Sequence, residues 1–146
     1  MTNKSKKILT EISAGELLDK ISILEIKLEN IKDKEKLAEI NKEYKSLEET
    51  KKFNIEITNN LQKLTDQLKK INLKLWDIEE EKRICEKNSD FGEKFIQLSR
   101  NVYLNNDKRA KIKSDINKLL GSNIKEVKSY SYICIFFPKI LQNCEL

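Results

Sequence analysis

The stretch SRNVYLNNDKRAKIK, residues 99–113, holds the side chains best suited to binding chemistry. It contains Arg100 and Arg109, two of only three arginines among the 29 basic residues of the chain. Arginine is expected where a planar, permanently charged fork must hold a carboxylate or a phosphate. We therefore interpret this region as a candidate anion-binding site. Its predicted lining residues are Trp76, Arg100, Tyr103, Asn106, Asp107 and Arg109.

The position of Arg109 in the apolar pattern bears on this interpretation. The heptad that begins with Phe95 and Leu98 continues through Arg109, and folding the chain back at Asp90 brings this residue close to Trp76. A buried guanidinium requires an acidic partner or an anionic ligand. We take Glu25 and Glu29 as possible acidic partners. The alternative is that the arginine side chain reaches out of the seam into solvent while Asn105 only sets the helix register.

The rest of the chain offers little for catalysis. It contains no histidine, which removes the commonest general base and metal ligand. In the run WDIEEEKR the residues Glu79, Glu80 and Glu81 point in successive directions around a helix, so we interpret them as a solvated face. Three cysteines without CxxC spacing indicate neither a disulfide framework nor a zinc site. We expect no catalytic residues, no metal and no cofactor.

Apolar residues recur at steps of three and four, which predicts amphipathic helices. Ser13 and Glu16 have capping-box spacing, so the first helix should start there and extend to Ile31. The second helix is expected over residues 34–50, and the longest over residues 57–78, with the pattern resuming at Cys85. The low mean hydropathy of −0.62 is typical of helices that bury one stripe. These patterns predict an all-α antiparallel bundle or coiled-coil hairpin with a long third helix.

The last helix carries one open question. Its heptad continues across Asn105, Asn106 and Asp107, so one long helix and two helices joined by a loop both fit residues 95–120. Gly121 should end it. We divide the chain into a flexible N-terminus (1–12), a helical bundle domain (13–121) and a C-terminal tail (122–146). The tail includes the apolar sequence YSYICIFFPKILQNCEL, for which we expect an irregular or β-like structure.

The charge is unevenly distributed along the chain. From Asp77 to Glu93 acids outnumber bases, whereas residues 94–128 carry nine bases and three acids. A basic stripe of Lys108, Arg109, Lys111, Lys113 and Lys118 could bind phosphates of a nucleic acid without sequence preference. Few aromatic residues accompany it, so we treat nucleic-acid binding as the weaker alternative. No apolar run suits a signal peptide or a membrane span, and we expect a cytoplasmic location.

Several blocks of the sequence resemble a known family. They are ISAGELLDKISILEIKLENI, LWDIEEEKR, DFGEKFIQLSRNVYLNNDKRAKIKSDINKLLGS and KEVKSY. Together they are similar to a family of short bacterial helical proteins known only as a domain of unknown function. The resemblance covers residues 12–130 and implies a weak link to surface-glycan or sugar-transfer systems. The matching positions are Gly15, Glu16, Leu17, Asp19, Lys20, Glu25, Lys27, Trp76, Arg100, Asn106, Asp107, Arg109 and Gly121.

These features favour a small helical binding or scaffolding module over an enzyme. Its partner would be a protein or an anionic small molecule, and a homodimer could form through the helical seam. A helical enzyme that clamps an anionic substrate stays open as an alternative, because such enzymes work through arginine and lysine alone.

Overall fold

A computed structural model describes residues 8–129 of the chain as four α-helices, without a strand in that range. The helices are α1 (Ala14–Asn30), α2 (Lys34–Asn54), α3 (Asn59–Lys87) and α4 (Glu93–Leu119). This confirms the all-α prediction. Residues 122–129 are irregular, and the remainder of the predicted β-like tail, residues 130–146, lies outside the described residues.

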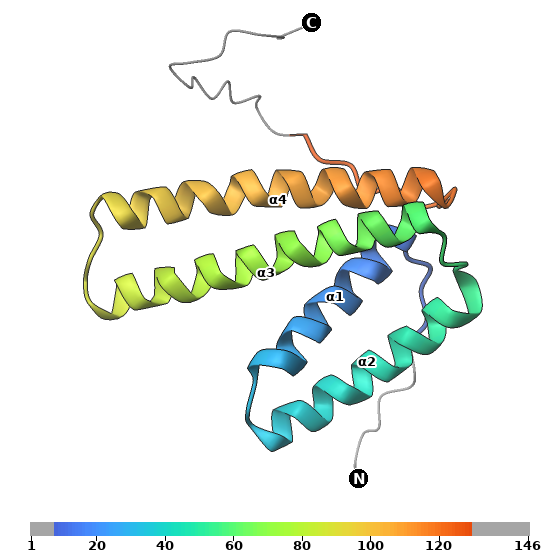
Figure 1. Cartoon of the computed structure of the whole chain (residues 1–146), viewed down its shortest axis with the longest axis horizontal. Helices are drawn as coiled ribbons and strands as arrows, with labels where there is room; N and C mark the ends of the chain where they lie inside the picture. The colour runs from blue at the N-terminus through green and yellow to red at the C-terminus, as the bar shows by residue number, and fades with distance from the viewer. Residues whose placement is uncertain (1–7, 130–146) are drawn as a thin grey trace, which may run out of the picture.

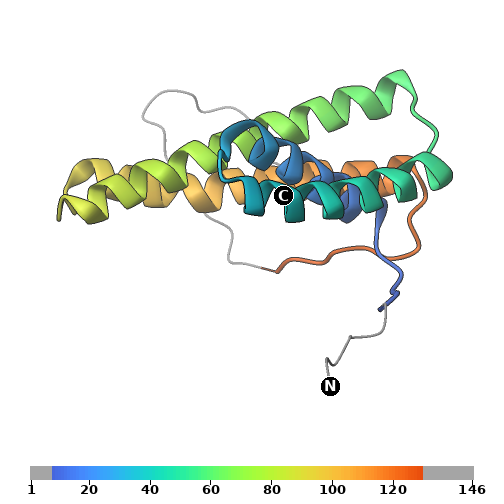
Figure 2. The ribbon, with the colours of Figure 1, turned by 90° about the horizontal axis from the view of Figure 1, so that it is seen from below.

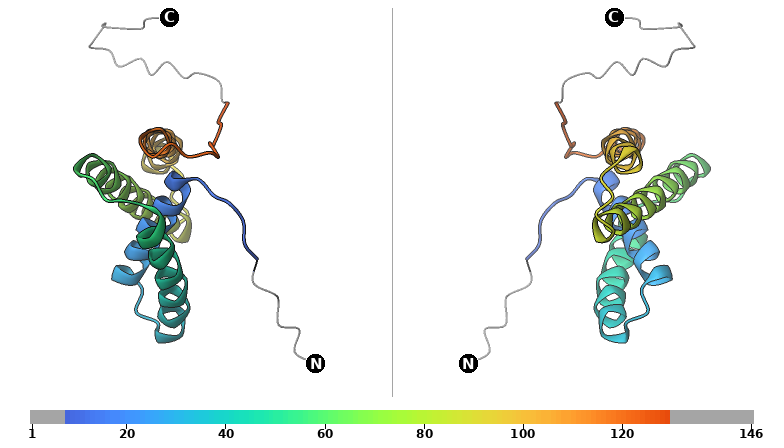
Figure 3. Two further views of the ribbon diagram at one scale, coloured as in Figure 1. Left: turned by 90° about the vertical axis from the view of Figure 1, so that its right-hand side faces the viewer. Right: turned by 90° about the vertical axis from the view of Figure 1, so that its left-hand side faces the viewer.

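Helix α1 is the central element of the bundle and packs against the other three helices (Figures 1 and 3). It begins where the capping box predicts, with the Ser13 hydroxyl accepting a hydrogen bond from the Glu16 amide at 3.2 Å. Buried residues, both apolar and polar, occupy most of its circumference, and Leu18 and Ile26 are each 1% exposed. A helix that is covered on most sides depends on its neighbours for stability.

Helix α2 lies on the outside and, among the helices, packs only against α1. It contains no buried residue, since its apolar stripe is partly covered by one neighbour. Asp33 caps its start by accepting a hydrogen bond from the Lys36 amide. The helix continues to Asn54, four residues beyond the predicted end at Thr50.

Helices α3 and α4 form an antiparallel hairpin whose turn extends past α1 and α2 (Figures 1 and 2). They have 29 and 27 residues, so the prediction of a dominant third helix holds only in part. Asp90 lies three residues before Glu93, the spacing of a helix start, but it does not cap α4. Its carboxylate accepts a hydrogen bond from the amide of Gly92, and Gly92 is the N-cap. Helix α4 runs unbroken across Asn105, which answers the question that the sequence left open.

Two apolar clusters hold the helices together. The first joins Leu18 of α1, Leu61 and Leu68 of α3, and Ile116 of α4. The second lies nearer the hairpin turn and contains Ile78, Cys85 and Leu98. Because only the first cluster includes α1, the position of α1 is fixed at the end of the hairpin far from its turn.

The end of α4 confirms the role predicted for Gly121. This residue has φ of +62°, a left-handed conformation that glycine adopts without strain. Its amide donates to the Lys118 carbonyl at 3.3 Å, and the Ser122 amide donates to the Asn117 carbonyl at 2.9 Å. This pair of bonds is a Schellman motif. It turns the chain back towards the start of α1.

Candidate functional site

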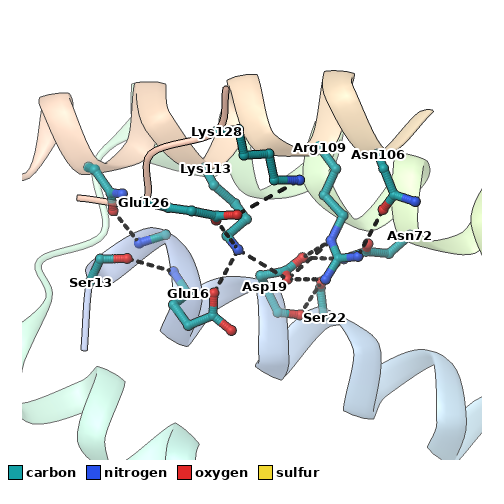
Figure 4. A network of polar contacts seen from close by, with 12 residues as sticks. Ser13, Glu16, Asp19, Ser22, Asn72, Asn106, Arg109, Lys113, Glu126 and Lys128 are labelled. Carbon is teal, nitrogen blue, oxygen red and sulfur yellow. Dashed lines mark hydrogen bonds and ion pairs between the residues drawn. The ribbon is translucent and has the colours of Figure 1, made fainter. Parts of the chain in front are cut away.

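A buried carboxylate, Asp19, lies at the centre of a polar network between α1, α3 and α4 (Figure 4). Asp19 is 1% exposed. Burying a carboxylate is tolerated only when charged and hydrogen-bonding partners surround it. The chain supplies these partners from two other helices, so the network joins α1 to both.

Arg109 of α4 is the main partner of Asp19. Its Nε lies 2.9 and 3.1 Å from the two carboxylate oxygens, and its Nη2 lies 2.5 Å from Oδ2. The remaining terminal nitrogen, Nη1, donates to the side-chain oxygen of Asn106 at 3.3 Å. The hydrogen bond with Asp19 raises the pKa of the guanidinium above its usual value. The arginine therefore stays charged, and its orientation is fixed while 27% of its side chain is exposed.

Asn72 of α3 completes the contacts of the buried carboxylate. Its amide nitrogen donates to Asp19 Oδ1 at 2.8 Å and to the Ser22 hydroxyl at 2.7 Å. The Ser22 hydroxyl in turn donates to the main-chain carbonyl of Asp19 at 2.8 Å. Asp19, Ser22 and Asn72 are all buried, so hydrogen bonds take the place of apolar packing at this contact between α1 and α3.

Lys113, one turn after Arg109, forms the second half of the network. Its ammonium lies 2.6 Å from Glu16 of α1 and 2.6 Å from Glu126, and 3.9 Å from Asp19. Burial lowers the pKa of Lys113, but the hydrogen bonds with both glutamates outweigh this effect and raise it. The hydrogen bond from Lys113 lowers the pKa of Glu126. Lys113 is thus a charged lysine whose side chain is only 7% exposed.

The start of α1 is held directly by the end of α4. The Gly15 amide donates to the side-chain oxygen of Asn117 at 2.7 Å, and the Ala14 amide donates to the Ser122 hydroxyl at 3.0 Å. A Cβ on Gly15 would lie 2.6 Å from the Lys113 carbonyl oxygen. Gly15 therefore permits the close approach that brings Asp19 within reach of Arg109.

A hollow of about 360 Å³ opens beside this network, where α1 separates from α3. Arg109 forms one part of its wall, and Trp76 with Leu75 forms another. Glu79, Glu80 and Arg83 lie further along α3 and complete the lining of the hollow. The full lining is Ile23, Ile26, Asn72, Leu75, Trp76, Glu79, Glu80, Arg83 and Arg109.

The structure brings only part of the predicted site together. Trp76 and Arg109 share the hollow, and Asn106 contacts Arg109. Arg100 is exposed, Tyr103 is half-buried, and neither lines the hollow. Asp107 borders a different, shallower groove on α3 and α4, which has Ile71 and Ile112 among its lining residues.

The suggested acidic partners of Arg109 are corrected by the structure. Glu25 and Glu29 both pair with Lys69 of α3, at 3.0 and 2.9 Å, whereas Arg109 pairs with Asp19. The two glutamates lie further along α1, on the side that faces Lys69. The alternative in which Arg109 extends freely into solvent is also wrong, because two of its nitrogens contact a buried carboxylate.

The basic stripe on the last helix is largely neutralised within the chain. Arg109 and Lys113 pair with acids of α1, and Lys111 pairs with Asp115 at 2.7 Å. Of the five predicted residues, only Lys108 and Lys118 form no ion pair with another described residue. This leaves little free charge for binding nucleic-acid phosphates.

Sequence reasoning missed Asp19, Asn72 and Lys113 as members of the network. One signal was present for Asp19: Gly15, Asp19 and Ser22 recur at steps of four and three, which places small and polar residues together on one face of the helix. Arg83 was also missed, because WDIEEEKR reads as a solvated run.

Two kinds of feature are absent from the described residues. Between residues 8 and 129, no group of three or more His, Cys, Asp or Glu side chains is placed to hold a metal ion. In the same part of the chain, no helix combines the length and the apolar character needed to cross a membrane.

Over residues 8–129, fold and network together define an all-α domain of four helices in which the central helix α1 is fixed by buried ion pairs. The chain belongs to the family described as "Family of unknown function (DUF6165)", whose model matches residues 8–141. This agrees with the resemblance found in its sequence blocks. No curated protein and no solved structure matches the chain.

Proposed function

We propose that this domain is a binding module that recognises a ligand or a partner segment carrying an anionic group, in the hollow beside Trp76. The observation that carries the proposal is the state of Arg109. Asp19 and Asn106 hold its guanidinium in place and use three of its five N–H donors, so that one N–H on each terminal nitrogen remains for a ligand, and the side chain is partly exposed beside the hollow. An arginine oriented in advance loses little freedom when it binds an anion.

The neighbours of Arg109 suggest the kind of ligand. Trp76 offers an aromatic surface for an apolar or planar body, and Arg83 supplies a second guanidinium. Glu79 and Glu80 line the same hollow and would repel a ligand with anionic charge along its whole length. We therefore favour a ligand with one anionic group and additional N–H or O–H donors.

Three predicted site residues are not part of this hollow. A contribution of Arg100, Tyr103 or Asp107 to binding stays a prediction from the sequence, and it requires a ligand that extends along α4. A homodimer through the helical seam is disfavoured, because Leu61 and Leu68 of that seam are 0% exposed within one chain. Nucleic-acid binding is the weaker proposal, given the neutralised lysines of α4.

The test uses intrinsic fluorescence, since Trp76 is the only tryptophan of the chain. The intact protein is titrated with inorganic phosphate, a nucleoside monophosphate and a nucleoside diphosphate sugar, with excitation selective for tryptophan. We expect saturable quenching or a spectral shift of Trp76 with the nucleoside monophosphate, which joins one phosphate to a planar base with N–H and O–H donors. Ligands with more negative charge should bind more weakly.

Two matched variants locate the site. Arg83→Gln should weaken binding about tenfold, which corresponds to the loss of one charge-assisted hydrogen bond. Arg100→Gln removes the same charge from an exposed position outside the hollow and should leave affinity within about twofold. Equal losses in both variants, or no tryptophan response to any probe, would contradict the proposed site.

A further inference from the structure

Residues 122–129, here called the strap, leave the end of α4 and pass across the polar network without regular structure. Seven of these residues are exposed, among them Val127 at 87% and Ile124 at 41%. The strap therefore has almost no apolar anchor. Segments with few buried contacts are the first to open in a folded protein.

Polar contacts hold the strap against the bundle. The Ser122 hydroxyl accepts from the Ala14 amide, and the side-chain nitrogen of Asn123 donates to the Glu11 carboxylate at 3.1 Å in an exposed position. The strongest contact is that of Glu126, whose carboxylate lies 2.6 Å from the ammonium of Lys113. The Lys113 side chain is 7% exposed and that of Glu126 is 37% exposed, so this ion pair is shielded from solvent on its lysine side.

The charges around Lys113 show what Glu126 contributes. Arg109 and Lys113 balance the charges of Asp19 and Glu16, and the strap adds the pair of Glu126 and Lys128. The Lys113 ammonium has three N–H donors, and Glu16 and Glu126 each accept from it at 2.6 Å. Opening the strap therefore leaves the network neutral but takes one close acceptor away from a buried ammonium.

We propose that the strap closes over an anion-binding site centred on Lys113, and that Glu126 is the chain's own occupant of this site. Opening the strap exposes Lys113 to an external carboxylate or phosphate group, which replaces Glu126 at the ammonium. This site is separate from the hollow beside Trp76, because Asp19 stands between Lys113 and Arg109 (Figure 4). The inference therefore does not depend on the proposed function.

Glu126 competes with an external anion for Lys113 and so reduces the affinity of the protein for that anion. The apparent affinity falls in proportion to the fraction of molecules in which the strap is open. If the strap is closed in roughly nine molecules of ten, removing the Glu126 charge strengthens anion binding about tenfold. Wild-type protein should bind the same anion weakly.

The experiment compares Glu126→Gln with the wild type by NMR of the full chain. Backbone order parameters of residues 124–128 should fall from about 0.85 towards 0.6 or below in the variant. Titration with inorganic phosphate should then shift the amide signals around Lys113 with an affinity about tenfold tighter than in the wild type. Adding Lys113→Met to the variant should abolish these shifts.

Lys128→Gln is the matched control, because it also removes one strap charge but leaves the contact between Glu126 and Lys113 intact. Its order parameters should equal those of the wild type. Unchanged order parameters in Glu126→Gln would overturn the role of Glu126 in closing the strap. A released strap without tighter phosphate binding would overturn the anion site, as would phosphate shifts that persist after Lys113→Met.

Discussion

The ion pair between Asp19 and Arg109 predicts a large and non-additive effect on stability. Asp19→Leu removes a carboxylate that is 1% exposed, so Arg109 and Asn72 lose their shared acceptor. Arg109→Leu leaves that carboxylate buried with only Asn72 and the more distant Lys113 as partners. Breaking a buried pair from either side costs about 3–5 kcal/mol. This is a large share of the roughly 5–15 kcal/mol that stabilises a domain.

The double variant Asp19→Leu/Arg109→Leu should be much less damaging than the sum of the two. Replacing both partners of a buried pair with apolar residues is often neutral or even stabilising. The two changes should therefore show a coupling energy of at least about 2 kcal/mol, within the range found for residues in direct contact. Asn72 keeps its hydrogen bond to Ser22 in each variant, which limits the loss in the double one.

The assay is urea unfolding followed by helical circular dichroism, with the free energy of unfolding taken from the midpoint and slope. Lys20→Leu, Glu43→Leu and their double variant form the control, because this pair also joins α1 to another helix but is about half exposed, at 48% and 49%. The control should show a coupling below about 1 kcal/mol. Single effects at Asp19 and Arg109 under about 1 kcal/mol, or strict additivity, would refute the reasoning.

Two further substitutions, the first with a matched control, test the packing of α1 and α4. Gly15→Ala should destabilise the protein by about 1–3 kcal/mol despite its better helix propensity, because the new Cβ would lie 2.6 Å from the Lys113 carbonyl oxygen. Gly92→Ala, whose nearest neighbour is 3.4 Å away, should change stability by less than about 1 kcal/mol in the same urea assay, and equal effects would contradict the clash. Asn105→Leu removes the buried Oδ1, which has no hydrogen-bond partner among the described residues, but also the bond from its side-chain nitrogen to the Asn101 carbonyl at 2.7 Å, so it should raise the free energy of unfolding by about 1 kcal/mol. A clear loss of stability would contradict this prediction.

Local signals in the sequence predicted the helices well, because they depend on residues a few positions apart. The capping by Ser13 and the left-handed turn at Gly121 follow from side-chain chemistry and backbone freedom. The signal at Asp90 failed because a Gly that follows two residues later also fits the N-cap, and the Asp90 carboxylate instead bonds the Gly92 amide.

The sequence by itself determined two possible outcomes for Arg109. The heptad places this guanidinium at an apolar seam, so the cost of burying an unpaired charge requires either an anionic partner or a side chain that reaches into solvent. That choice follows from periodicity alone, and the structure decided it in favour of the anionic partner.

Only the tertiary structure decided which acid that is. Asp19 is 90 positions away from Arg109 in the chain, and its contact depends on how α1 crosses α4 and on the close approach at Gly15. Glu25 and Glu29 carry the same charge on the same helix, but α1 presents them to Lys69 of α3 instead. Helix periodicity sets which side of a helix is apolar, whereas the crossing angle between helices, fixed by the packing of the whole core, sets which polar groups meet.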